Sequence, residues 1–289
     1  MLALDYKLLL NYKAIINRLE YNGYKLSILR LDEINVEISG NKWFKLKYNL
    51  EQAIIENKQT ILTFGGAYSN HIAATAAACQ LAGFKSIGII RGEESSASNT
   101  TLALAKENGM QLVFVSRELY KHKSEQAYLQ ALQAEYPDAY IIPEGGDNAL
   151  GQKGCEEILS NSTTDYDLIF CAHGTGTTYK GIAKSLLPHQ KLMAINVLKY
   201  EATSDLLNAN INNDYHFGGY AKHSTALLEF KTWFETTYHI PLDYVYMAKL
   251  MYAVFDLMKQ HKLSKDKKTL IVHSGGLQGN KGYEERYEI

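Results

Sequence analysis

Short apolar segments alternate with amphipathic helical patterns along most of the 289-residue chain. Segments such as Thr60–Phe64 and Leu168–Cys171 have the length and composition of buried strands, and helical patterns separate them from one another. This alternation is typical of parallel sheets that are covered by helices. Because the strands are too many for one small sheet, we predict an α/β protein with two domains, each an open twisted parallel sheet with helices on both faces.

The turn at Pro143–Gly146 is the best candidate for a crossover between the domains. We therefore predict a larger domain formed by residues 1–50 and 144–289, and a smaller α/β domain formed by residues 51–143. The expected helices are Tyr6–Arg18, Trp43–Asn57, Ser69–Leu81, Thr100–Asn108, Ser116–Glu135, Leu150–Ser160, Gly176–Leu186, Glu201–Asn208, Ser224–Thr236 and Tyr246–His261. The expected strands are Lys25–Arg30, Thr60–Phe64, Ser86–Ile90, Gln111–Val115, Tyr140–Ile142, Leu168–Cys171, Leu192–Val197 and Thr269–His273.

Composition argues against several classes of protein. The formal net charge is −1 and no stripe of basic residues is present, so a nucleic-acid partner is not expected. The three cysteines are scattered without a C-x-x-C pair, which argues against a disulfide framework and a structural zinc site. No apolar segment reaches the roughly 18 residues of a membrane span, and Met1–Lys7 lacks the layout of a signal peptide. We expect a cytoplasmic protein that binds neither membrane nor metal.

Three glycine-rich loops follow predicted strands, where open parallel sheets bind their ligands. The second loop, Gly174-Thr175-Gly176-Thr177-Thr178, has the features of a phosphate cradle. Its glycines permit close backbone approach, its threonines offer hydroxyl donors, and a helix begins behind it. The spacing fits neither the G-x-G-x-x-G fingerprint nor a Walker loop. A plain strand-to-helix turn with threonine caps remains the alternative.

The first and third loops are Gly65–His71 and His273–Asn280. In the first loop, Ser69 and Asn70 fall at a predicted helix N-terminus, where side chains and free backbone N–H groups can bind a carboxylate. Taken alone, this pattern is better explained by an ordinary helix cap, because Ser and Asn are the commonest N-cap residues.

A lysine directly follows a Gly-Asn turn in Ser39-Gly40-Asn41-Lys42, where a long helical pattern begins. A lysine held in this way can carry an aldehyde cofactor as a Schiff base. Taken alone, the segment favours an ordinary basic helix start, because Lys45 and Lys47 follow closely.

Together these motifs resemble the pyridoxal-phosphate enzymes of fold type II, the tryptophan-synthase-β-like family. Within it the chain is most similar to the branch of 1-aminocyclopropane-1-carboxylate deaminases and D-cysteine desulfhydrases. The resemblance extends from Arg30 to the last glycine loop and includes Glu144–Gly151, which resembles the family's crossover segment. It implies an active site in the cleft between the two domains, with pyridoxal 5'-phosphate as the cofactor.

The resemblance also assigns roles to individual residues. It implies that Lys42, next to Asn41, binds the cofactor and then acts as a general base. The loop of Gly174, Thr175, Gly176, Thr177 and Thr178 would hold the phosphate. Ser69-Asn70-His71 would bind the substrate carboxylate, and Asn70 would also bond the ring hydroxyl of the cofactor.

Three further residues follow from the resemblance. Tyr220 would contact the substrate, Tyr246 would lie against the pyridine ring or near the substrate α-carbon, and Ser274 would lie near the pyridine nitrogen. The expected catalytic residues are thus Lys42, Ser69, Tyr246 and Tyr220.

The chain departs from the family pattern at three positions. It has Ser39 for a glycine, Phe44 for an arginine, and Met247 where deaminases tend to have a glutamate. We therefore expect a lyase or deaminase, or more broadly a hydrolase, that acts on a small amino acid by α,β-elimination and forms a homodimer. The open alternatives are 1-aminocyclopropane-1-carboxylate deamination, racemisation, and cofactor binding without turnover.

Overall fold

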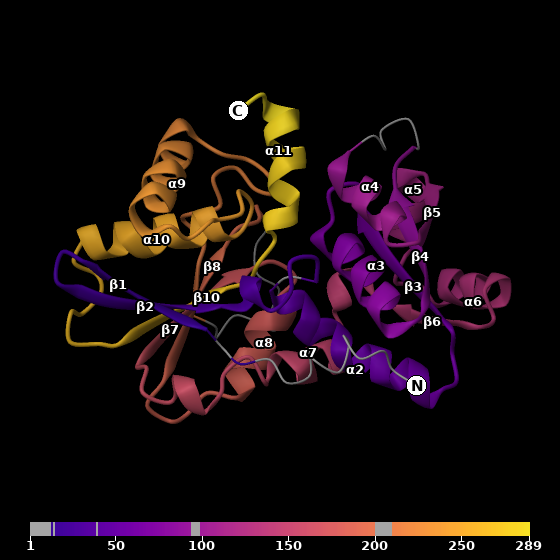
Figure 1. Cartoon of the computed structure of the whole chain (residues 1–289), viewed down its shortest axis with the longest axis horizontal. Helices are drawn as coiled ribbons and strands as arrows, with labels where there is room; N and C mark the ends of the chain where they lie inside the picture. The colour runs from indigo at the N-terminus through magenta and orange to yellow at the C-terminus, as the bar shows by residue number, and fades with distance from the viewer. Residues whose placement is uncertain (1–12, 14, 39, 94–98, 200–209) are drawn as a thin grey trace.

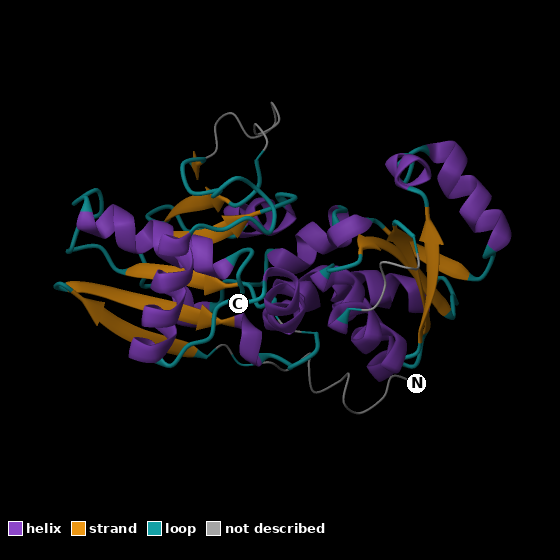
Figure 2. Cartoon of the chain, turned by 90° about the horizontal axis from the view of Figure 1, so that it is seen from above, coloured by secondary structure: helices purple, strands orange, loops and turns teal. Residues whose placement is uncertain are grey.

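The computed structural model describes residues 13, 15–38, 40–93, 99–199 and 210–289 (Figure 1). In these ranges the chain forms two separate sheets with helices packed around them. The two sheets lie side by side in the molecule, and helices fill the space between them (Figure 2). This arrangement confirms the predicted two-sheet α/β class.

The larger sheet has six strands in the order β1-β2-β10-β7-β8-β9. Its strands are β1 (Ile16–Tyr21), β2 (Tyr24–Arg30), β7 (Leu168–His173), β8 (Lys191–Asn196), β9 (Ile211–Asn212) and β10 (Thr269–His273). Strands β2, β10, β7, β8 and β9 run parallel, so their carboxyl ends meet at one edge. That edge is where the sequence predicted ligand-binding loops.

Strand β1 corrects two expectations. It pairs antiparallel with β2, so this sheet is not purely parallel. Residues 16–18 are strand rather than the end of the expected Tyr6–Arg18 helix, of which residues 1–12 and 14 lie outside the described residues. The reason is a tight hairpin at Asn22-Gly23, where both residues have positive φ, 49° and 80°. An Asn-Gly pair between two strand patterns is a strong hairpin signal.

The smaller sheet has four parallel strands in the order β5-β4-β3-β6. They are β3 (Thr60–Gly66), β4 (Lys85–Arg91), β5 (Met110–Val115) and β6 (Ala139–Ile142). The helices of this part are α3 (Asn70–Ala82), α4 (Thr100–Glu107), α5 (Arg117–Lys121) and α6 (Gln126–Glu135). The single helix expected over 116–135 is thus two, because a turn intervenes in which His122 Nδ1 bonds Glu125 Oε1 at 2.7 Å.

The remaining helices cover the larger sheet and join it to the smaller one. They are α2 (Asn41–Ile55), α7 (Ala149–Cys155), α8 (Thr177–Lys184), α9 (Thr225–Tyr238), α10 (Met247–Lys259) and α11 (Asn280–Tyr287). Helix α7 ends five residues earlier than expected, α11 was not expected at all, and the expected helix at 201–208 lies outside the described residues. None of the helices in the described ranges is long and apolar enough to cross a membrane.

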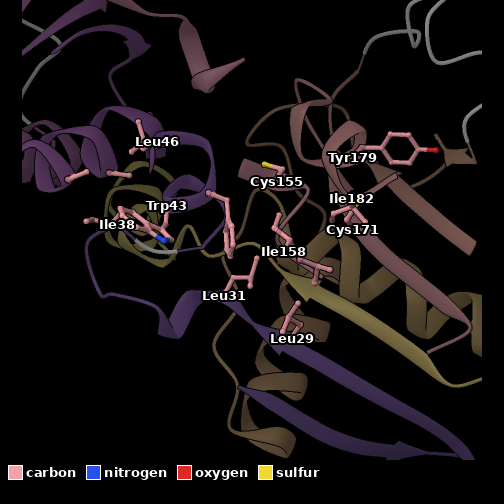
Figure 3. Packing of buried hydrophobic residues seen from close by; sticks show 14 of the residues in the cluster. Leu29, Leu31, Ile38, Trp43, Leu46, Cys155, Ile158, Cys171, Tyr179 and Ile182 are labelled. Carbon is pink, nitrogen blue, oxygen red and sulfur yellow. The ribbon is translucent and has the colours of Figure 1, made fainter. Parts of the chain in front are cut away.

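Buried apolar side chains on the two faces of the larger sheet form two clusters. One cluster joins the sheet to α2, α7 and α8 and includes Leu29, Trp43 and Cys155 (Figure 3). The other packs α9 and α10 on the opposite face, with Phe234 and Phe255 at its centre. Helix α11 stands between the two halves of the molecule (Figure 1). The loops at the carboxyl edge of the larger sheet are therefore held from both faces.

Candidate active site

The turn that carries Lys42 is fixed against the end of strand β10. Gly40 has a positive φ of 76°, and a Cβ atom there would lie 1.8 Å from the Ser274 carbonyl oxygen, so only glycine fits. The next backbone N–H, that of Asn41, donates to the same oxygen at 3.1 Å. The Gly-Asn turn and the third glycine loop, more than 230 residues apart in the sequence, are thereby in direct contact.

Asn41 connects this turn to the predicted phosphate loop. Its side-chain amide donates to the Thr178 hydroxyl at 2.8 Å, and its carbonyl oxygen accepts a hydrogen bond from Lys42 Nζ at 2.9 Å. Burial, together with the smaller effect of the neighbouring Lys45 charge, lowers the pKa of the Lys42 amine to about 7. A large share of the Lys42 side chains is therefore neutral near pH 7, as a nucleophilic amine requires.

The loop at Gly174–Thr178 has the backbone expected of an anion site. Gly176 is in the left-handed region with φ of 93° at the N-terminus of α8, which directs free N–H groups and the positive helix end outward. Thr175 and Thr177 are hydrogen-bonded to each other at 3.1 Å, and the Thr177 hydroxyl donates to Asp147 Oδ1. The structure thus brings the loop and the Lys42 turn together.

Ser69, Asn70 and His71 begin helix α3, at the end of strand β3. The Ser69 hydroxyl accepts from the Ile72 N–H at 3.4 Å, so it is a helix cap, which is the alternative that the sequence left open. The Asn70 amide lies against the third glycine loop, since a Cβ atom at Gly276 would be 2.8 Å from Nδ2. Within the described residues, Asn70 Oδ1 is buried without a hydrogen-bond partner.

His71 is buried against strands β3 and β6 of the smaller sheet. Its Nε2 lies 2.8 Å from the Thr63 hydroxyl, which itself donates to the Ile142 carbonyl at 2.9 Å, so Nε2 must carry the proton. Burial, reinforced by the charges of Lys42 and Lys45, holds the pKa of His71 well below its ordinary value. His71 is therefore neutral, and its Nδ1 has no partner within the described part of the chain.

The two tyrosines and Ser274 lie around this assembly. The Tyr246 ring packs on Gly174, where a Cβ atom would be 3.2 Å from the ring. Tyr220 is 47% exposed, and its hydroxyl donates to the Tyr68 carbonyl at 3.4 Å. Ser274 donates to the sulfur of Met247 from its N–H at 3.3 Å and from its hydroxyl at 3.6 Å. Met247 is fully buried, so the position at which deaminases tend to have a glutamate is apolar here.

Two residues near Lys42 were not predicted as site residues. Lys45, which the sequence reading treated as an ordinary helical residue, is only 4% exposed, and burial lowers its pKa. It follows Lys42 at a spacing of three, which places both side chains on one face of α2, and this spacing could have indicated it.

The second is Asp243, whose carboxylate accepts the N–H groups of Val245, Tyr246 and Met247 at 2.8–2.9 Å. Asp243 is 2% exposed, and burial raises its pKa despite these three bonds. An aspartate ahead of a helical pattern is typical of an N-cap, so the sequence could have indicated that Asp243 caps the start of α10.

A cavity opens beside this assembly and is lined by both halves of the molecule. Tyr68 and Asn70 line it from the side of the smaller sheet, and Tyr220, Asp243 and Gly276 from the side of the larger sheet. Lys42 is not part of its lining, so the cavity adjoins the lysine site rather than containing it. Its walls nevertheless bring Asn70 and Tyr220 together, as the sequence predicted for a substrate site in a cleft.

The fold and the site together define an α/β enzyme scaffold in which a partly buried lysine lies beside a glycine- and threonine-rich helix start at the edge of a parallel sheet. Residues 17–216 match the family model described as pyridoxal-phosphate dependent enzyme. The chain belongs to this family, as its sequence motifs predicted, and pyridoxal phosphate is its cofactor.

Individual relatives of the chain carry deaminase and desulfhydrase names. The mitochondrial bifunctional D-cysteine desulfhydrase/1-aminocyclopropane-1-carboxylate deaminase of Arabidopsis thaliana is 30% identical over 89% of this chain and 74% of its own length. The D-cysteine desulfhydrase of Salmonella paratyphi B is 25% identical over 89% of this chain and 88% of its own. A solved homologue of 1-aminocyclopropane-1-carboxylate deaminase covers 99% of this chain and 98% of its own, with 26% identity and a TM-score of 0.79. These names, deaminase and desulfhydrase, correct the broader expectation of a hydrolase.

Proposed function

We propose that the chain is a pyridoxal-phosphate-dependent lyase that removes a leaving group from the β-carbon of a small amino acid, as D-cysteine desulfhydrases do. Cysteine and one water would give the 2-oxo acid, ammonia and hydrogen sulfide. The names of two relatives support the desulfhydrase reaction. We further propose that the enzyme is a cytoplasmic homodimer, and that residues 51–143 form one domain and the rest the other.

The residues present fit the cofactor. The first turn of α8 offers free backbone N–H groups to a phosphate, and the side chains of Thr175, Thr177 and Thr178 lie beside them. The Lys42 amine, with its pKa of about 7, is suited to bind an aldehyde. The unpartnered Asn70 oxygen is suited to accept a hydroxyl proton.

When bound, pyridoxal phosphate supplies an electron sink for the substrate α-carbon. The protein's own groups would do the rest. Lys42 Nζ takes the proton from the α-carbon, as the C–S bond breaks and its electron pair leaves with the sulfur. The N–H groups at the start of α3 and the Asn70 side chain hold the substrate carboxylate. Tyr220 and Tyr246 would close the site on the side of the larger sheet.

The contact between Ser274 and Met247 is the observation that favours elimination. A hydroxyl paired with a thioether sulfur cannot hold a proton on a ring nitrogen as a glutamate would. Elimination needs less electron withdrawal than ring opening, because the leaving group takes the electrons. We therefore place elimination ahead of 1-aminocyclopropane-1-carboxylate deamination.

A keto-acid assay tests the reaction with D-cysteine, L-cysteine, D-serine and 1-aminocyclopropane-1-carboxylate as substrates. We expect turnover of a cysteine with release of sulfide, and little turnover of the cyclopropane. Ring opening faster than sulfide release would overturn the proposed reaction and leave the cofactor assignment intact.

Borohydride reduction followed by peptide mapping tests the site. The covalent cofactor adduct should map to Lys42 and disappear in Lys42→Ala. Lys47→Met, on the same helix but paired with Glu157, is the matched control and should retain the adduct. An adduct on Lys45 or Lys47 in the wild-type enzyme would contradict the assignment.

A further inference from the structure

Lys249 lies one helical turn after Tyr246 in α10 and is fully buried. Its three ammonium hydrogens meet three backbone carbonyl oxygens: Val197 at 3.2 Å, His216 at 2.9 Å and Gly219 at 2.6 Å. An ammonium has three donors, so all are satisfied by backbone. Among the described residues no carboxylate forms a salt bridge with it. The carbonyls form a cation site that Lys249 fills.

Two of these carbonyls belong to a segment whose backbone is unfavourable by itself. Within residues 217–221, φ is positive at Phe217 (52°), Gly218 (94°), Gly219 (114°) and Ala221 (53°). The left-handed region costs a non-glycine residue roughly 1 kcal/mol, and such conformations persist only where surrounding contacts hold them. Lys249 contacts the carbonyls on either side of Phe217 and Gly218, so it holds the segment at this turn.

The remaining part of this segment faces the active-site cavity. Tyr220 lines the cavity and reaches the Tyr68 carbonyl of the other half. The Ala221 carbonyl accepts hydrogen bonds from the hydroxyls of Tyr283 at 3.2 Å and Tyr287 at 2.8 Å, both on α11. Helix α11 therefore holds the segment at its far end, while Lys249 holds it from the interior.

We propose that Lys249 is a positioning residue, which acts as an internal cation to hold the segment His216–Ala221 so that Tyr220 stands over the active-site cavity. Its third bond, to the end of strand β8, fixes the same ammonium to the larger sheet. The link to substrate binding rests on the proposed function. The link to the segment does not, and it can be measured without turnover.

Amide hydrogen exchange of the holoenzyme tests the link to the segment. In Lys249→Met, which keeps the apolar stem but removes the donors, exchange in peptides covering 216–221 should be at least about ten-fold faster, the change expected for lost bonds to a charged group. Lys47→Met is the matched control, because Lys47 is also buried but its ammonium pairs with Glu157. Equal exchange in this segment for the two variants would overturn the proposal.

Chemical rescue tests the internal-cation role. Lys249→Ala removes a group equivalent to propylammonium, so added propylammonium should slow exchange of the segment towards the wild-type rate, whereas 1-propanol should not. Equal effects of the two additives, or none, would show that the carbonyls do not form a cation site. Where the alanine variant fails to fold, Lys249→Met with its control still decides the proposal.

Kinetics of D-cysteine turnover test the action through Tyr220. Lys249→Met and Tyr220→Ala should each raise KM, and the double variant should be little worse than Tyr220→Ala alone. Lys47→Met combined with Tyr220→Ala should be additive. Additive effects of Lys249 and Tyr220 would overturn the positioning role. A wild-type enzyme without turnover would refute the proposed function instead, and the exchange measurements would still decide the role of Lys249.

Discussion

At Lys42, burial removes much of the water that would stabilise an ammonium group, and the Lys45 charge opposes a second positive charge. The pKa falls from 10.5 to about 7 on folding. Between these values the unfolded chain binds a proton that the folded chain does not, so the free energy of unfolding rises with pH through this window. At pH values below about 7 the buried Lys42 ammonium destabilises the fold to its full extent, and above pH 10.5 this destabilisation vanishes.

We predict that Lys42→Met stabilises the cofactor-free protein at pH 7 by on the order of 3 kcal/mol, and that the gain disappears as the pH approaches 10.5. Urea unfolding at pH 7 and pH 10 measures this difference. Lys47→Met serves as the control and should be destabilising at pH 7, because it leaves Glu157 without its ammonium partner. A gain of equal size at both pH values would show that protonation is not its cause.

At the residue scale, the sequence predicted which lysine begins the helix, because the Gly-Asn turn is local. It could not predict that the Ser274 carbonyl requires glycine at position 40, since that contact joins segments more than 230 residues apart. The burial of Lys45 and Lys249 was missed for a related reason. A lysine in a helical pattern is ordinarily solvated, and only tertiary packing reveals the carbonyls or loops that it meets.

At the scale of elements, helices α2 and α7 touch through their backbones. A Cβ atom at Gly154 would lie 1.7 Å from the Phe44 carbonyl oxygen, so the two helices can approach closely only because position 154 lacks a side chain. This contact supports the helix that begins with Lys42. A glycine inside a helix otherwise costs roughly 0.5–1 kcal/mol relative to alanine.

Replacing a glycine inside a helix by alanine ordinarily stabilises a protein. We predict that Gly154→Ala instead destabilises this one by about 2–3 kcal/mol or more, because the added methyl group would overlap the backbone of α2. Thermal or urea unfolding measures the change. Gly282→Ala in α11 is the matched control, since its Cβ would meet only ordinary contacts at 3.5 Å from Tyr68, and it should be neutral or stabilising. A neutral Gly154→Ala would mean that α2 and α7 can separate without cost.

Elements with a local signal were predicted well, and those without one were not. Helix α3 followed from its Ser69 cap, and α8 from its glycine loop. The hairpin of β1 carried an Asn-Gly signal that the helical pattern before it obscured. Helix α11 has no continuous apolar face, and it is held instead by tertiary contacts such as the stacking of Tyr283 on Tyr244 at 4.5 Å. Such contacts are invisible in the sequence.

At the scale of the whole molecule, the site depends on which strands share a sheet. Strands β2 and β10 are neighbours although more than 200 residues separate them, and their pairing brings the Lys42 turn next to Ser274. The alternating pattern predicted parallel sheets but could not give the order of the strands within a sheet, so it could not place β2 beside β10. The smaller sheet contributes Asn70 to the same place, so the cofactor would contact both halves of the molecule.

This arrangement predicts that the cofactor stabilises the molecule as a whole. At 100 times its dissociation constant, pyridoxal phosphate should add about 2.7 kcal/mol to the free energy of unfolding, which corresponds to a rise of roughly 5–10 °C in the unfolding midpoint. Differential scanning calorimetry with and without cofactor measures the shift.

Two variants separate the contributions to this shift. Lys42→Met should lose most of the shift, because the covalent attachment is gone, and should keep only the part that the intact phosphate loop supplies. Asn70→Ala should retain the covalent adduct but show a smaller shift than the wild type, because one half of the molecule would no longer contact the cofactor. An undiminished shift in Asn70→Ala would mean that the larger sheet alone binds the cofactor.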